Sequence, residues 1–123
     1  MNPYASPQAY RSSSVMTASP GQLVVMLYDG AGRFLRQAEI AAAEGAWSHA
    51  MDRLDKADAI VDELLVTLDT VQGGQIAERL QGIYVFCKRL LIEARVDRDA
   101  GKIRRTAALL TDLRDAWAEI ATS

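Results

Sequence analysis

Apolar residues recur at intervals of three and four from residue 20 almost to the C-terminus, the spacing that places side chains on one face of an α-helix. Four such segments are separated by breaks at Gly45, Gly73-Gly74 and Asp97-Arg98-Asp99. No segment shows the alternation typical of a half-buried strand. The pattern therefore predicts an all-α fold of four amphipathic helices, and the short connections favour an antiparallel up-down four-helix bundle.

Local signals place the ends of these helices. Ser19 precedes Pro20, and Gln22 stands where the second half of a capping box is expected, so the first helix should begin at about Pro20. Gly45 is a suitable stop for that helix, and Asp99 is a candidate N-cap for the last one.

One face of each helix supplies the predicted core. In the first helix these residues are Leu23, Met26, Leu27, Phe34, Leu35, Ala38 and Ala42. In the second they are Ala50, Leu54, Ala57, Val61, Leu64, Leu65 and Leu68. The third contributes Ile76, Leu80, Ile83, Cys87, Leu90 and Ala94, and the fourth contributes Ile103, Ala107, Leu110, Leu113 and Trp117.

Residues 1–18 differ in character from the rest of the chain. They hold Pro3, Pro7 and a run of three serines with few apolar anchors, which predicts an irregular N-terminal arm. The expected organisation is therefore a flexible arm over residues 1–18 followed by one bundle domain over residues 19–120.

Composition and charge narrow the class of protein. The chain has 123 residues, 50% of them hydrophobic and 24% charged, which is typical of a single globular domain. Its net charge of −2 gives no global attraction to nucleic acid or anionic lipid. The start lacks the features of a signal peptide, and no stretch is apolar enough to span a membrane. We expect a cytoplasmic protein that does not insert into membranes.

No residue pattern predicts catalysis or a cofactor. Asp55, Asp58 and Asp62 share a helix face but have no histidine or opposing carboxylates, so a solvated face is expected in place of a metal site. His49 lacks a catalytic partner, and Cys87 lies on an apolar stripe where a buried thiol is usual. We therefore expect no enzyme activity, no metal and no cofactor.

A locally basic run extends from Lys88 to Arg105. It is the main argument for an alternative function, a small nucleic-acid-binding regulator. Acidic residues interrupt the run and no aromatic residues lie between its cations to stack on bases, so a solvated face or a patch for an acidic protein is favoured.

Surplus apolar residues are more informative. At about 100° per residue, Val85, Ile92 and Val96 lie opposite the predicted core stripe of the third helix. Val25 and Tyr28 lie away from the stripe of the first helix. Exposed apolar stripes tend to mark interaction surfaces, such as a site for an amphipathic partner helix. Pairing of two copies of the chain, or wider burial, would also explain them.

Several short motifs together resemble the flagellar secretion chaperone FliS family. They are Ala9-Tyr10, Ser14-Val15, Thr17-Ala18-Ser19-Pro20, Met26-Leu27-Tyr28-Asp29-Gly30, Leu68-Asp69, Gly73-Gly74, Ile76-Ala77, Leu90-Leu91, Glu93-Ala94 and Leu113-Arg114-Asp115-Ala116-Trp117. The resemblance extends over essentially residues 9–118.

The resemblance implies a cytoplasmic chaperone with a bundle fold. Such a protein binds the disordered C-terminal region of flagellin, prevents its premature polymerisation and delivers it to the flagellar export gate, while its N-terminal segment moves aside. The candidate contact residues are Tyr10, Val15, Val25, Tyr28, Val85, Ile92 and Val96. The motif supplies Tyr10 and Val15 without distinguishing contact with flagellin from closure of the groove. A general adaptor that binds another amphipathic helix remains an alternative, as does a homodimer.

Overall fold

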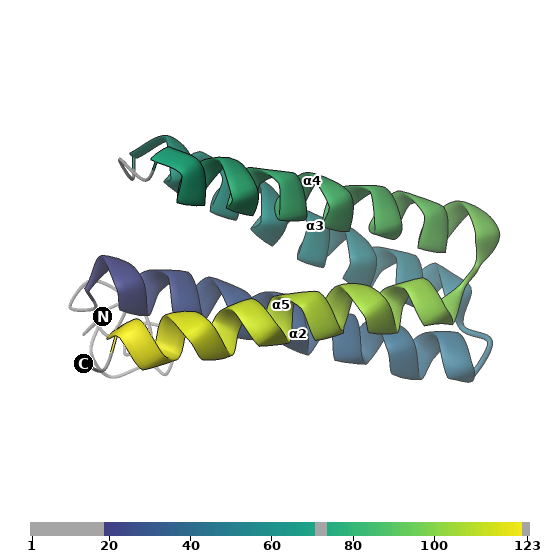
Figure 1. The fold of residues 1–123 in the computed structure, drawn as a ribbon. Helices are drawn as coiled ribbons and strands as arrows, with labels where there is room; N and C mark the ends of the chain where they lie inside the picture. The colour runs from purple at the N-terminus through teal and green to yellow at the C-terminus, as the bar shows by residue number, and fades with distance from the viewer. Residues whose placement is uncertain (1–18, 71–73, 122–123) are drawn as a thin grey trace, which may run out of the picture.

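A computed structural model describes residues 19–70 and 74–121. The four helices in these ranges are α2 (Pro20–Ala43), α3 (Trp47–Thr70), α4 (Gly74–Asp97) and α5 (Ala100–Ala121). Successive helices run in opposite directions (Figure 1). The prediction of an all-α, antiparallel four-helix bundle is confirmed, and the predicted arm lies outside the described residues.

The helices are not equally close to one another. α2 packs most closely, against α3 on one side and α5 on the other, whereas α4 meets α3 and α5 more sparsely. In Figure 1 α3 and α4 form one layer, and α2 and α5 form the other. α4 therefore lies diagonally across the bundle from α2 and is the helix with the least backbone packing.

The predicted helix ends are confirmed. The Ser19 hydroxyl accepts a hydrogen bond from the backbone N–H of Gln22 at 3.2 Å, and the Gln22 side chain accepts one from the Ser19 N–H at 2.8 Å. Gly45 follows α2 with φ +76°, a conformation that favours glycine. The Asp99 carboxylate accepts from the Gly101 N–H at 2.9 Å and so caps α5.

A heptad-like spacing of three and four residues organises the core. The buried positions on α2 are Val24, Tyr28, Ala31, Leu35, Ala38, Ala41 and Ala42, and those on α3 are Ala50, Leu54, Ala57, Val61 and Leu64. On α4 they are Leu80, Tyr84, Cys87, Leu90, Leu91 and Ala94, and on α5 they are Ile103, Thr106 and Leu110. This spacing is the one that lets side chains of near-parallel or antiparallel helices interdigitate.

Several residues depart from the predicted stripes, among them Val24, Tyr28, Ala31, Ala41 and Leu91, which are buried although no stripe included them. Met26 and Ile76 were expected in the core, but their side chains are 36% and 68% exposed. Thr106 is fully buried beside the predicted position Ala107, and its hydroxyl donates to the carbonyl oxygen of Lys102 at 2.9 Å. A threonine can be buried here because the preceding helical turn satisfies its hydroxyl.

Small residues explain the close approach of α2 and α3. Ala31, Ala38 and Ala57 are completely buried, so little side-chain volume separates the two helices. A Cβ atom added at Gly30 would lie 3.2 Å from Cδ1 of Ile60. This pair of helices is therefore packed near its limit, while the larger Tyr84 and Leu91 side chains occupy the space beneath α4.

Candidate partner-binding site

An apolar pocket opens at the end of the bundle where α2 and α4 begin and α3 and α5 finish, at the left of Figure 1. All four helices contribute to its wall, which consists of Val24, Thr67, Leu68, Ile76, Ala77, Leu80, Tyr84 and Trp117. Its cavity volume is about 30 Å³, so it is a shallow depression. We call this the end pocket. Apolar side chains form most of its surface, so an apolar group from outside the bundle can pack against it.

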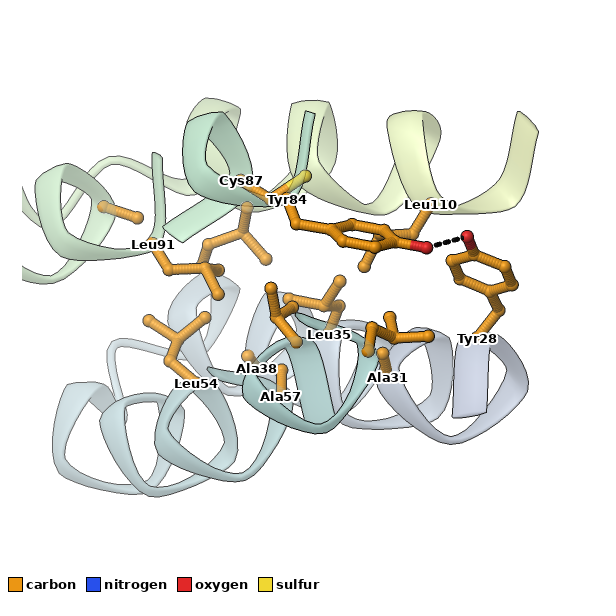
Figure 2. Packing of buried hydrophobic residues seen from close by; sticks show 14 of the residues in the cluster. Tyr28, Ala31, Leu35, Ala38, Leu54, Ala57, Tyr84, Cys87, Leu91 and Leu110 are labelled. Carbon is orange, nitrogen blue, oxygen red and sulfur yellow. Dashed lines mark hydrogen bonds between the residues drawn. The ribbon is translucent and has the colours of Figure 1, made fainter. Parts of the chain in front are cut away.

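One wall residue of the end pocket, Tyr84, pairs with a second buried tyrosine, Tyr28. The hydroxyl groups of Tyr28 and Tyr84 are hydrogen-bonded to each other, as Figure 2 shows. Burial is the main cause that raises the pKa of both phenols above the usual range. Both side chains therefore stay neutral at physiological pH, and the polar pair is enclosed by otherwise apolar walls.

A second surface lies on the side of α4 that faces away from the core. Val85, Ile92 and Val96 are 50%, 57% and 76% exposed and follow one another at helical spacing. Arg89 is exposed among them. We call these four residues the α4 outer face. The prediction that Val85, Ile92 and Val96 lie outside the core is confirmed.

Ion pairs border the α4 outer face on the α3 side. The Lys88 ammonium lies 3.0 Å from a carboxylate oxygen of Asp58 and 2.5 Å from one of Asp62. Burial lowers the pKa of Lys88, but the hydrogen bonds to the two aspartates more than offset that effect and the pKa is raised. Arg95 pairs with Asp55 farther along α4. Charge is thus largely balanced along this border.

The α5 side has a different border. Lys102 lies 3.3 Å from Glu93 and 3.5 Å from Asp97, so it engages both acidic residues on this side of α4. The Arg105 guanidinium lies 5.0 Å from the centre of the Phe86 ring, within range of a cation–π contact. A polar rim therefore surrounds an apolar centre, an arrangement typical of protein interaction sites.

These pairs also bear on the basic run between residues 88 and 105. Lys88, Arg95 and Lys102 each engage at least one carboxylate. The run is therefore not a continuous array of free cations that could follow a phosphate backbone.

The other predicted contact residues have mixed outcomes. Tyr28 was expected on a second apolar face of its helix, and this placement is wrong, because Tyr28 is 2% exposed and part of the core. Val25 is half-buried. Tyr10 and Val15 lie outside the described residues. The structure thus places Val85, Ile92 and Val96 together, apart from Tyr28.

The end pocket was not predicted from the residue pattern. Its wall combines residues expected in the core, such as Leu68, Leu80 and Trp117, with Val24 and Thr67, which were on no predicted stripe. A cavity depends on how far apart the helix ends lie, and residue spacing along one helix does not specify that distance. The strict three-four spacing from Val24 through Tyr28 to Ala31 is the signal that would have located its α2 wall.

Two kinds of site would give the described ranges a chemical role, a metal-binding cluster and a reactive thiol. Residues 19–70 and 74–121 contain no cluster of three or more histidine, cysteine, aspartate or glutamate side chains able to hold a metal ion. Cys87 is buried, and burial raises the pKa of its thiol to about 11, so the reactive thiolate is disfavoured. None of the helices in these ranges has the length and apolar character needed to cross a bilayer.

Comparison with known proteins places these surfaces in context. A family model described as "Flagellar protein FliS" matches residues 2–123. The flagellar secretion chaperone FliS of Salmonella typhimurium is 38% identical over 88% of this chain and 81% of its own length. The protein of the same name in Bacillus subtilis is 34% identical over 94% of this chain and 84% of its own length. The flagellar secretion chaperone FliS of Campylobacter jejuni is 30% identical over 91% of this chain and 88% of its own length.

Proposed function

Because this chain belongs to the FliS family of flagellar secretion chaperones, we propose that it binds the disordered C-terminal region of flagellin in the cytoplasm. By holding that region it prevents premature polymerisation and delivers flagellin to the flagellar type III export gate. The observation that carries the proposal is the family match over residues 2–123, taken together with the exposed apolar side chains of α4.

The α4 outer face supplies one part of the binding surface in this proposal. A disordered tail loses conformational entropy when it becomes ordered on a partner, so binding requires a substantial apolar contact to offset that cost. Val85, Ile92 and Val96 provide such a contact without disturbing the core. Val25, half-buried on α2, is a further candidate contact.

The end pocket supplies a second part. An apolar side chain of the tail packs against its wall, which anchors the segment at the end of the bundle. Each Å² of apolar surface covered in this way contributes about 25 cal/mol. Tyr28 acts here from the interior, because its hydroxyl holds Tyr84 at the inner side of the pocket.

We also propose a role for residues 1–18. They join α2 at Ser19, and Val24 in the wall of the end pocket is only five positions farther along. Through Tyr10 or Val15 this arm would cover apolar surface in the absence of flagellin and move aside when the tail binds. Residues 1–18 are long enough to reach this apolar surface from Ser19, since an extended chain spans up to about 3.3 Å per residue.

The mechanism proposed is stoichiometric sequestration, with no chemical step. A general adaptor for another amphipathic helix would use the same exposed residues, so the partner has to be established by experiment.

A polymerisation assay tests this function. Purified flagellin is seeded to form filaments in the presence of increasing amounts of the chain, and filament growth is followed by light scattering. The expected result is inhibition that is complete near one chain per flagellin. Ile92→Asp is the matched variant, and it should inhibit less while remaining helical by circular dichroism. Undiminished filament growth at an excess of the folded wild-type chain would oppose the proposal.

A further inference from the structure

We propose that the α4 outer face binds an amphipathic helix whose apolar stripe carries acidic residues along one edge, the edge that lies toward α5. This inference rests on the proposed function, because the α4 outer face is part of the surface assigned to the flagellin tail. It adds the conformation and the charge of the segment that lies there.

The apolar residues of this face form a narrow, straight stripe. At about 100° per residue, Val85, Ile92 and Val96 fall within roughly 40° of arc on α4. Val96 lies eleven residues after Val85, so the stripe is about 16 Å long at 1.5 Å per residue. A stripe of this width and length matches the i, i+3, i+4 and i+7 anchors of a partner helix of about three turns.

Arg89 gives the stripe its charge. Its side chain is exposed between Val85 and Ile92, and its guanidinium makes no ion pair or hydrogen bond with another side chain in the described ranges. Glu93, one turn farther along α4, is the natural intrahelical partner for Arg89, but it lies 3.3 Å from the Lys102 ammonium. Arg89 therefore remains available to a carboxylate on a partner.

The position of Arg89 defines which edge is basic. Phe86, three residues earlier, contacts Arg105 of α5, and Glu93, four residues later, contacts Lys102 of α5. Arg89 shares their side of α4 and therefore lies on the border toward α5. Arg105, which also has no carboxylate partner in the described ranges, adds a second cation there.

The opposite border has no comparable charge. Lys88 is held by Asp58 and Asp62, and Arg95 by Asp55. A partner helix would thus meet positive charge on one border and balanced charge on the other. Charge complementarity favours acidic residues on only one edge of that helix.

The same charge argues against a second copy as the occupant. An antiparallel pairing that sets Val85 against Val96 of the second copy would bring the two Arg89 positions within about 4.5 Å along the helix axis. Like charges at that separation oppose association. An acidic amphipathic helix avoids this repulsion and gains an ion pair that is partly shielded from water.

Two synthetic peptides test the inference. Both are helix-forming sequences of about three to four turns with the same leucine stripe, and they differ only in carrying glutamate or lysine along one edge. Their affinities are measured by fluorescence anisotropy for the wild-type chain and for Arg89→Glu, Ile92→Asp and Arg36→Glu. Arg36, an exposed arginine of α2, is the matched charge control.

We expect the glutamate peptide to bind the wild-type chain on the order of tenfold more tightly than the lysine peptide. Arg89→Glu should abolish or reverse this preference, Ile92→Asp should weaken both peptides, and Arg36→Glu should change neither. Equal affinities of the two peptides, no binding of either, or an equal effect of Arg36→Glu would overturn the inference.

A parallel titration with the C-terminal peptide of flagellin separates the two proposals. If that peptide binds the wild-type chain and Arg89→Glu equally well, the proposed function stands and the inference about α4 fails. If it does not bind while the glutamate peptide does, the inference stands and flagellin is not the partner.

Discussion

The hydroxyl groups of Tyr28 and Tyr84, 56 positions apart in the chain, share a hydrogen bond in the interior of the bundle. The two residues belong to α2 and α4, which lie diagonally opposite each other (Figure 1). The pair thus connects the closely packed α2 to the sparsely packed α4, and Tyr84 forms part of the wall of the end pocket. Loss of the Tyr28–Tyr84 hydrogen bond should therefore lower the stability of the fold and change the shape of the end pocket.

Removing either hydroxyl should destabilise the fold. In Tyr28→Phe the buried Tyr84 hydroxyl loses its partner, and in Tyr84→Phe the Tyr28 hydroxyl keeps only its interaction with Trp117, so each change should cost about 1–3 kcal/mol. The double variant should cost less than the sum of the single ones, because it leaves no orphaned hydroxyl of the pair. Urea denaturation followed by circular dichroism measures all three. Strict additivity of the two effects would show that the hydroxyls are not energetically coupled.

Enlarging a buried alanine in the α2–α3 contact should also destabilise the fold. Ala57→Leu adds volume where Ala57 is completely enclosed, and overpacking of this kind costs about 1–3 kcal/mol. Ala59→Leu, two positions away on the exposed side of α3, is the control and should change the melting temperature little. Equal effects of the two substitutions would contradict the assigned helix face.

Stability should decline at alkaline pH. Burial raises the pKa of the Cys87 thiol to about 11, so the folded state retains this proton after the unfolded state has lost it. The stabilisation is complete below the ordinary thiol pKa and disappears as the pH rises to about 11, a loss of about 1–3 kcal/mol. The raised pKa values of Tyr28 and Tyr84 act in the same direction at higher pH.

Denaturation curves at pH 8, 9.5 and 10.5 measure this decline. Cys87→Ala is the control, since its free energy of unfolding should fall less steeply over the same interval. Parallel pH profiles for the two proteins would exclude a contribution from the thiol.

Trp117 should report occupation of the end pocket, because its side chain forms part of the wall. Trp47 is the other tryptophan, at the start of α3 and the opposite end of the bundle, so Trp47→Phe isolates the signal. Addition of the flagellin C-terminal peptide should shift the emission to shorter wavelength as the pocket is filled. Deletion of residues 1–18 should shift it to longer wavelength and increase binding of a hydrophobic dye. Unchanged spectra in both experiments would argue against the end pocket as an anchor.

Much of the fold followed from local rules in the sequence. The capping box at Ser19, the stop at Gly45 and the cap at Asp99 each depend on residues within a few positions of one another, and each was predicted. Four amphipathic segments with short connections were enough to indicate an antiparallel bundle.

The register of the first helix was harder to predict. Its apolar residues cover more than one face, so a stripe through Leu23 and Met26 competes with one through Val24 and Tyr28. The stripe through Val24 and Tyr28 is the buried one, because it includes the alanines that allow α3 to approach α2 closely. Alanine is only weakly hydrophobic, so these positions contribute little to an apolar pattern in the sequence. Tyr28 could be buried because it meets Tyr84, a partner that no pattern within one helix could reveal.

The candidate site shows the same division. The exposure of Val85, Ile92 and Val96 followed from helix geometry, because three residues opposite a core stripe cannot join that core. The availability of Arg89 could not be predicted, since it depends on Lys102 of another helix occupying Glu93. The end pocket likewise depends on the relative positions of four helix ends.

The most direct test of the chaperone function is calorimetric titration of the full chain with a peptide that covers the C-terminal region of flagellin from the same cell. We expect saturable binding of one peptide per chain, with a clearly negative heat-capacity change from burial of apolar surface. Absence of binding heat at several temperatures, with a chain that is folded by circular dichroism, would contradict it.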